Sequence, residues 1–139
     1  MINNCCQLSP LIFIINIIIG LYNNYLLYSL LFFSLTITSI IYHTYYTDFT
    51  YIIDKVAILY IILYGMLLFY QKINFITINF VNIIMCIIII LTFLSVFYIY
   101  HYGFYIKEYC FNNDINISYK YHSLIHYISC LSHSLIMLL

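Results

Sequence analysis

Hydrophobic stretches separated by short polar interruptions run along the whole chain and predict an all-α protein. Five stretches have helical length, and they cover residues 8–22, 25–42, 54–70, 76–100 and 121–139. A helix needs about 20 apolar residues to cross the hydrocarbon core of a bilayer. We therefore expect a polytopic membrane protein, a bundle of about five transmembrane helices that forms a single domain over residues 1–139.

The first two stretches meet at Asn23-Asn24, which we interpret as a tight turn between two helices. Two adjacent asparagines in the middle of a membrane would be costly unless their amides were paired. The alternative is one tilted helix through both asparagines, which would remove one crossing. Ser9-Pro10 is a plausible helix start. No basic region or cleavage site is apparent, so we expect the first helix to be retained and not removed as a signal peptide.

Composition points to the same environment. Hydrophobic residues make up 66% of the chain and charged residues 6%, whereas a soluble domain usually carries about 25% charged residues. The four basic residues are all lysines, too few for the basic surface that binds nucleic acid, so no nucleic-acid partner is expected. The five cysteines form an odd set without a CxxC pair, which argues against a disulfide framework and a thiolate zinc site.

The lysines also indicate an orientation. With five crossings, Lys55, Lys107 and Lys120 lie on or near the side of the amino terminus, and Lys72 lies on the other side. Lysine and arginine are enriched in cytoplasmic loops. We therefore expect a multi-pass protein with a cytoplasmic amino terminus.

A few polar residues within the hydrophobic pattern are the candidates for chemistry. Ser39 and His43 are four residues apart and share one helix face, and so do His122 and His126 on the last stretch. Asp54 opens the third stretch. The five crossings place all of these residues near the same membrane surface, where they could converge.

Three neutral imidazoles with an open fourth position form the ligand set of a catalytic zinc site. Zinc lowers the pKa of its bound water toward about 7, which gives a nucleophile at neutral pH. Asp54 would take the proton from that water, and the Ser39 hydroxyl would donate to a developing oxyanion. The sequence therefore predicts a Zn²⁺ site with His43, His122 and His126 as ligands.

The same residues carry a resemblance to a known family. Ser39-x-x-x-His43, then Asp54, then His122-x-x-x-His126 resembles the superfamily of alkaline ceramidases, progestin/adipoQ receptors and hemolysin III, often called CREST. The resemblance implies that the three histidines bind zinc and that the serine and aspartate assist hydrolysis of a lipid amide, with a ceramide-like substrate. The spacing of His43 and Asp54 is similar to the alkaline ceramidase branch, and the Ser39–His43 segment is also similar to the hemolysin III branch.

The chain departs from that family in three respects. The family core has seven spans, so the chain resembles a shortened version, and loss of one pair of spans between Asp54 and His122 would keep the site on one membrane side. The acidic amino-terminal residues that bind calcium in alkaline ceramidases have no match in residues 1–7, so calcium is not expected. Lys55 follows Asp54 where the ceramidase branch usually has an acid.

Two other functions fit parts of the pattern. His133 continues the stripe of His122 and His126 about two turns deeper, and His43 paired with His126 or His133 could ligate a b-type haem from two helices. A non-catalytic membrane protein, either a structural subunit or an inactive family member, is the other alternative. A homo-oligomer that encloses the site is possible and has no specific signal in the sequence.

Overall fold

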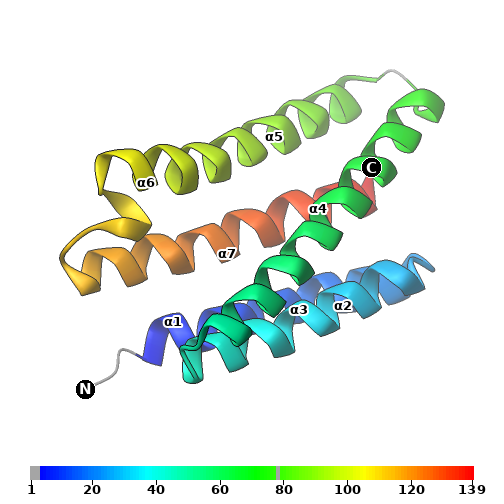
Figure 1. Ribbon diagram of the computed structural model, residues 1–139. Helices are drawn as coiled ribbons and strands as arrows, with labels where there is room; N and C mark the ends of the chain where they lie inside the picture. The colour runs from blue at the N-terminus through cyan, green and yellow to red at the C-terminus, as the bar shows by residue number, and fades with distance from the viewer. Residues whose placement is uncertain (1–3, 78) are drawn as a thin grey trace.

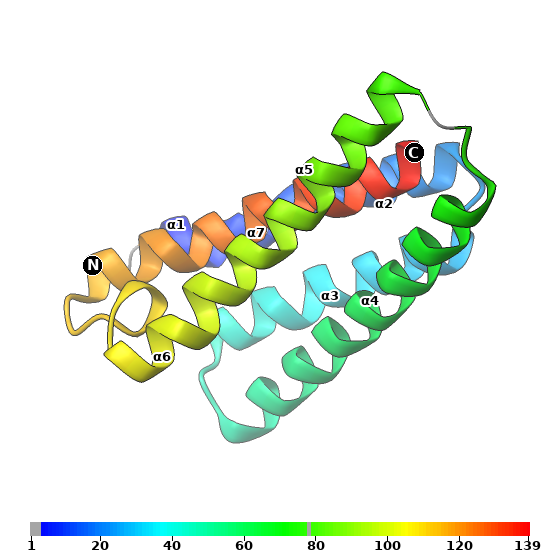
Figure 2. The same cartoon turned by 90° about the horizontal axis from the view of Figure 1, so that it is seen from above.

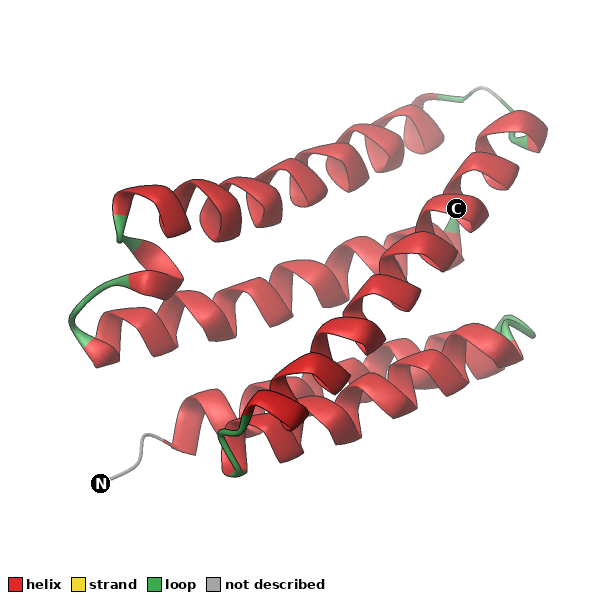
Figure 3. Cartoon of the chain, in the orientation of Figure 1, coloured by secondary structure: helices red, strands yellow, loops and turns green. Residues whose placement is uncertain are grey.

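The computed structural model describes residues 4–77 and 79–139, and within these residues the chain forms helices and no strands (Figures 1 and 3). The elements in chain order are α1 (Asn4–Leu8), η1 (Ser9–Phe13), α2 (Ile14–Tyr22), α3 (Leu26–Thr44), α4 (Asp48–Phe75), α5 (Phe80–Phe97), η2 (Tyr98–Tyr102), α6 (Gly103–Ile106), η3 (Tyr109–Phe111) and α7 (Ile115–Leu138). The short elements join their neighbours into five helical runs, so the prediction of an all-α bundle of five helices is confirmed.

The predicted turn at Asn23-Asn24 is present and separates α2 from α3. Asn24 has a left-handed backbone with φ of 63°, a conformation that asparagine tolerates better than most residues. The Asn23 amide donates to the Ile19 carbonyl at 2.9 Å, which satisfies one carbonyl at the end of α2. The reversal packs α2 along α3, where a side chain at Gly20 would collide with Ser29 Oγ.

The third helix begins six residues earlier than the sequence pattern predicted. Thr47 and Thr50 form a reciprocal capping box, in which each side chain accepts from the backbone N–H of the other. Such a box satisfies two amide groups that a helix start leaves without partners. Asp54 therefore lies in the second turn of α4, and its expected position as the first residue of the helix is wrong.

The last helix, α7, contacts α2, α4, α5 and the amino-terminal elements, and Figure 2 shows it running along α1 and α2. It is also polar, and its buried residues include the polar set Ser123, His126, Ser132, His133 and Ser134. Polar side chains of this kind need partners when they are buried. The surrounding helices supply some of them, as when Asn16 of α2 donates to the Ser134 hydroxyl at 3.0 Å.

Three helical segments are long and apolar enough to cross a membrane, namely Leu26–Thr44, Asp48–Phe75 and Phe80–Phe111. The segment Cys6–Tyr22 is apolar but shorter. Few residues of the Phe80–Phe111 segment are buried, with 6% of its most apolar window buried inside the bundle. An apolar surface of this extent favours a lipid environment over water, and three of the five expected spans have the required length and composition.

Candidate metal centre

Three histidines from two helices meet at one end of the bundle. His43 lies in the last turn of α3, and His122 and His126 lie one turn apart on α7. The His43 ring lies 4.8 Å from the His122 ring and 5.7 Å from the His126 ring, measured between centroids. One nitrogen from each ring can be chosen so that the three lie within 4.8 Å of one another, which is close enough for them to hold a metal ion.

The hydrogen bonds of Ser9 determine which nitrogen of His126 carries the proton. The Ser9 hydroxyl donates its single hydrogen to the Cys6 carbonyl at 3.0 Å, and its oxygen lies 2.7 Å from His126 Nδ1. With the hydroxyl hydrogen on the Cys6 carbonyl, the oxygen accepts a hydrogen from Nδ1, and this arrangement satisfies both contacts. In this tautomer His126 Nε2 has a free lone pair, which is the form that binds a metal.

His43 is arranged in the same way by Cys6. The Cys6 sulfur lies 3.7 Å from His43 Nδ1, whereas His43 Nε2 is buried and has no hydrogen-bond partner among the described residues. Buried nitrogen atoms without a partner are rare and require an explanation such as a missing ion. A metal ligated by Nε2, with Nδ1 held by a second layer of residues, is the common arrangement for histidine ligands. The three residues therefore fit a metal ion.

Asp54 and Ser39 lie beside each other, separate from the three-histidine group. Both are 2% exposed, and the Ser39 hydroxyl interacts with the Asp54 carboxylate. Asp54 Oδ2 lies 3.3 Å from Lys55 Nζ, and Asp54 Oδ1 is buried without a hydrogen-bond partner among the described residues. Asp54 is not part of the group that could ligate a metal, so its candidate role is to move a proton or orient a neighbour.

Lys55 lies within a cage of aromatic rings. Its ammonium group lies 5.6 Å from the Tyr42 ring, 5.2 Å from the Tyr51 ring and 5.6 Å from the Tyr100 ring. Attraction to the ring faces and to the Asp54 carboxylate stabilises a cation in these surroundings. Lys55 is thus paired with its sequence neighbour Asp54.

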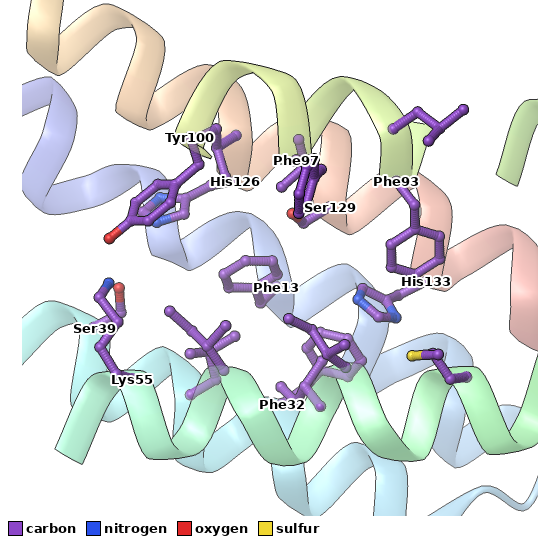
Figure 4. Close-up of a pocket in the computed structure, with 18 of the residues that line it drawn as sticks. Phe13, Phe32, Ser39, Lys55, Phe93, Phe97, Tyr100, His126, Ser129 and His133 are labelled. Carbon is purple, nitrogen blue, oxygen red and sulfur yellow. The ribbon is translucent and has the colours of Figure 1, made fainter. Parts of the chain in front are cut away.

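A cavity of about 570 Å³ extends from this end of the bundle between α4 and α5. Figure 4 shows Ser39, Lys55, Tyr100 and His126 at one end of the cavity and His133 at the other. Its walls are mostly apolar, and they include Phe13, Phe32, Leu35, Ile58, Ile61, Ile62, Met66, Phe69, Ile90, Phe93, Leu94, Val96 and Phe97. A mostly apolar cavity with several polar groups at the end next to the histidine cluster suits an amphipathic molecule.

Sequence reasoning identified the three histidines but missed Cys6 and Ser9, which hold two of them. His101, which lacks a partner at helical spacing in the sequence, is exposed and lines the cavity apart from the histidine cluster.

The structure thus defines a helical protein with a candidate three-histidine metal centre beside an apolar cavity. Comparison of the chain with protein-family models, curated proteins and solved structures finds no match.

Proposed function

We propose that this chain is a membrane-embedded, zinc-dependent hydrolase of a lipid amide. The observation that carries the proposal is the convergence of His43, His122 and His126. The Nδ1 atoms of His43 and His126 contact Cys6 and Ser9, and His43 Nε2 is buried without a hydrogen-bond partner among the described residues. Tetrahedral zinc with three histidine ligands and one open position is the simplest ion for such a site. The resemblance of the Ser39, Asp54 and histidine spacing to the CREST superfamily supports the same reading.

Bound zinc would supply a Lewis acid and a water that ionises near neutral pH. Asp54 Oδ1, buried and without a partner, would accept the proton of the attacking water. Ser39 lines the cavity. Its hydroxyl hydrogen would turn from the Asp54 carboxylate to the oxygen on which charge develops once Asp54 has taken the proton. The ion pair with Lys55 would hold the Asp54 carboxylate in place.

The cavity supports a substrate with a long apolar part. Among the described residues, α4 and α5 make no substantial contact with each other, and side chains of both helices line the cavity. With α4 and α5 in a bilayer, a lipid chain would enter between them while its amide lies next to the histidines. Five crossings and a cytoplasmic amino terminus remain part of this proposal.

The haem alternative fits the geometry less well. The His122 ring lies 4.8 Å from the His43 ring and 5.1 Å from the His126 ring, in edge-to-face contact with both. A porphyrin between His43 and His126 would need the space that His122 occupies. His133 Nδ1 is bonded to the Tyr28 hydroxyl, and the ring packs against Phe32 and Phe93.

The test is the metal content of the detergent-purified chain, measured by mass spectrometry. We expect about one zinc per chain in the wild type, and loss of zinc in the His122→Ala/His126→Ala double variant. His101→Ala is the matched control and should keep the ion, because His101 lies outside the cluster. Well-folded wild type without affinity for zinc would overturn the proposal and favour the non-catalytic alternative.

Zinc-loaded protein would then be screened against lipid amides for release of a fatty acid. Release by the wild type and loss of release in the double variant would support the hydrolase. Zinc binding without release from any lipid amide would indicate an inactive protein that keeps the metal site.

A further inference from the structure

A second polar group lies at the apolar end of the cavity, away from the metal centre. His133 is 3% exposed and lines the cavity about two turns along α7 from His126 (Figure 4). Its ring packs edge-on against Phe32 and Phe93, with centroids 5.4 Å and 5.3 Å away. A buried imidazole among aromatic rings needs a reason, since an apolar side chain would fill the same space without a polar cost.

The hydrogen bond with Tyr28 determines what His133 offers to the cavity. The Tyr28 hydroxyl bonds to His133 Nδ1, and Tyr28 is fully buried with no other hydrogen-bond partner among the described residues. If Nδ1 carried the hydrogen, the hydroxyl hydrogen of Tyr28 would be left buried without an acceptor. Tyr28 therefore donates, and the ring hydrogen of His133 is on Nε2.

His133 Nε2 has no hydrogen-bond partner among the described residues. It is also absent from the fully buried atoms that lack a partner, so it is accessible from the cavity. Because the His133 side chain lines the cavity, this N–H donor is available to whatever occupies the cavity. Ser129 lies one turn before His133 and lines the same cavity. The wall formed by α7 thus carries polar groups along its length, while the α4 wall beyond Lys55 is apolar.

The helix α4 approaches Tyr28 and His133 closely at Gly65. A Cβ atom at Gly65 would lie 2.6 Å from the Tyr28 hydroxyl oxygen and 2.9 Å from His133 Nδ1. Such distances are far shorter than van der Waals contacts, so only glycine lets α4 approach the hydrogen-bonded pair. Tyr28, Gly65 and His133 come from three different helices, and together they make a built polar site in an apolar region.

We propose that His133 binds an oxygen atom in the middle of the lipid chain, so that the substrate is an oxygenated acyl amide. The inference rests on the proposed function, which places the amide at the metal centre. His126 and His133 are separated by seven residues, or about 10 Å along the helix axis. An extended alkyl chain advances by about 1.3 Å per carbon, given C–C bonds near 1.5 Å. The oxygen therefore lies on the order of eight to ten carbons from the scissile carbonyl.

Fatty acids are the products that such a hydrolase would release, and they serve as binding probes without any turnover. The experiment measures the affinity of the zinc-loaded, detergent-purified chain for stearate and for stearates with a hydroxyl at carbon 5, 10 or 16. We expect the 10-hydroxy acid to bind about tenfold more tightly than stearate, as one good hydrogen bond allows. The 5- and 16-hydroxy acids should bind no better than stearate.

Two variants assign the preference to His133. His133→Phe should abolish the preference, so that stearate and the 10-hydroxy acid bind equally, because phenylalanine keeps the aromatic packing but offers no hydrogen-bond donor. Tyr28→Phe keeps the imidazole but removes the hydroxyl that places the ring hydrogen on Nε2. The preference for the 10-hydroxy acid should therefore decrease. Phe93→Leu is the control, and it should weaken both acids to the same extent.

The outcomes separate this inference from the proposed function. Equal affinities for stearate and all hydroxy acids would overturn the inference but not the proposed function. Water would then be the hydrogen-bond partner of His133. A preference that survives His133→Phe would also overturn it. If no fatty acid binds to the zinc-loaded chain, the cavity does not hold acyl chains, and the lipid-amide function fails together with the inference.

Discussion

Ser9 and His126 are 117 residues apart in the sequence, and their side chains are joined by a 2.7 Å hydrogen bond. When the Ser9 hydroxyl donates to the Cys6 carbonyl, this bond favours the imidazole tautomer that leaves Nε2 for a metal. The amino-terminal segment is therefore part of the candidate metal centre, although it contributes none of the three ligands.

Replacing Ser9 tests this arrangement directly. Ser9→Ala leaves His126 Nδ1 without its acceptor, so the ring can turn and change tautomer. We expect zinc affinity, measured by competition with a chelator, to fall about 10- to 100-fold, the usual effect of losing a residue that holds a ligand. Ser34→Ala removes an exposed serine that bonds only to its own helix and should not change the affinity. Unchanged affinity in Ser9→Ala would show that the tautomer is set in another way.

Replacing Asp54 should affect hydrolysis without affecting zinc binding. Asp54→Asn removes the group that takes a proton but none of the three histidines, so zinc content should stay at the wild-type value. Hydrolysis of a lipid amide should fall by about 10²- to 10⁴-fold, the range for loss of general-base catalysis. Asp48→Asn changes an exposed acid in the first turn of the same helix and should retain activity. Loss of zinc in Asp54→Asn would contradict the assigned role.

Zinc should stabilise the folded chain. An ion that binds only the folded state adds about 2.7 kcal/mol to the free energy of unfolding at a free concentration 100 times its Kd. Thermal unfolding in detergent should therefore shift to higher temperature when zinc is added and return when a chelator is added. The shift should be absent in His122→Ala and present in His101→Ala. Equal shifts in both variants would mean that zinc binds elsewhere.

Gly65 should not tolerate a side chain. An alanine Cβ would lie 2.6 Å from the Tyr28 hydroxyl oxygen, and Tyr28 is fully buried and cannot swing into solvent. Overpacking of this kind costs about 1–3 kcal/mol, which exceeds the gain in helix propensity from glycine to alanine. Gly65→Ala should lower the unfolding temperature, whereas Ser95→Ala on the exposed face of α5 should change it little. An unchanged unfolding temperature would mean that α4 can move away.

Helical periodicity was sufficient to predict which ligand residues share a face. His122, His126 and His133 recur at spacings of four and seven residues, and in the structure all three line the same cavity. The turn at Asn23-Asn24 could also be predicted, because the polar pair interrupts an apolar run. Both features depend on residues that are close in the sequence.

Other features depend on residues that are distant in the sequence or on signals that the hydrophobic pattern hides. Ser9 and Cys6 reach the histidines only through packing of the first helix against the last, and no local pattern marks them. The sequence predicts the start of α4 at Asp54 because the preceding Tyr/Thr-rich segment, residues 43–51, is typical of a polar loop. The Thr47–Thr50 capping box starts the helix at Asp48 instead, and the spaced threonines were a signal that was overlooked.

The contacts between the first and last helices also constrain the order of assembly during synthesis. Ser9 and Asn16 leave the ribosome early, but their partners on α7 are made only after most of the chain. Contacts with such a long loop between them form late, because the intervening chain must be ordered first. Until α7 arrives, the amino-terminal helix exposes Asn16 without its partners, and the ligand set is incomplete. The three-histidine group can therefore form only after translation of α7, and a ribosome stalled within α5 would display His43 without His122 and His126.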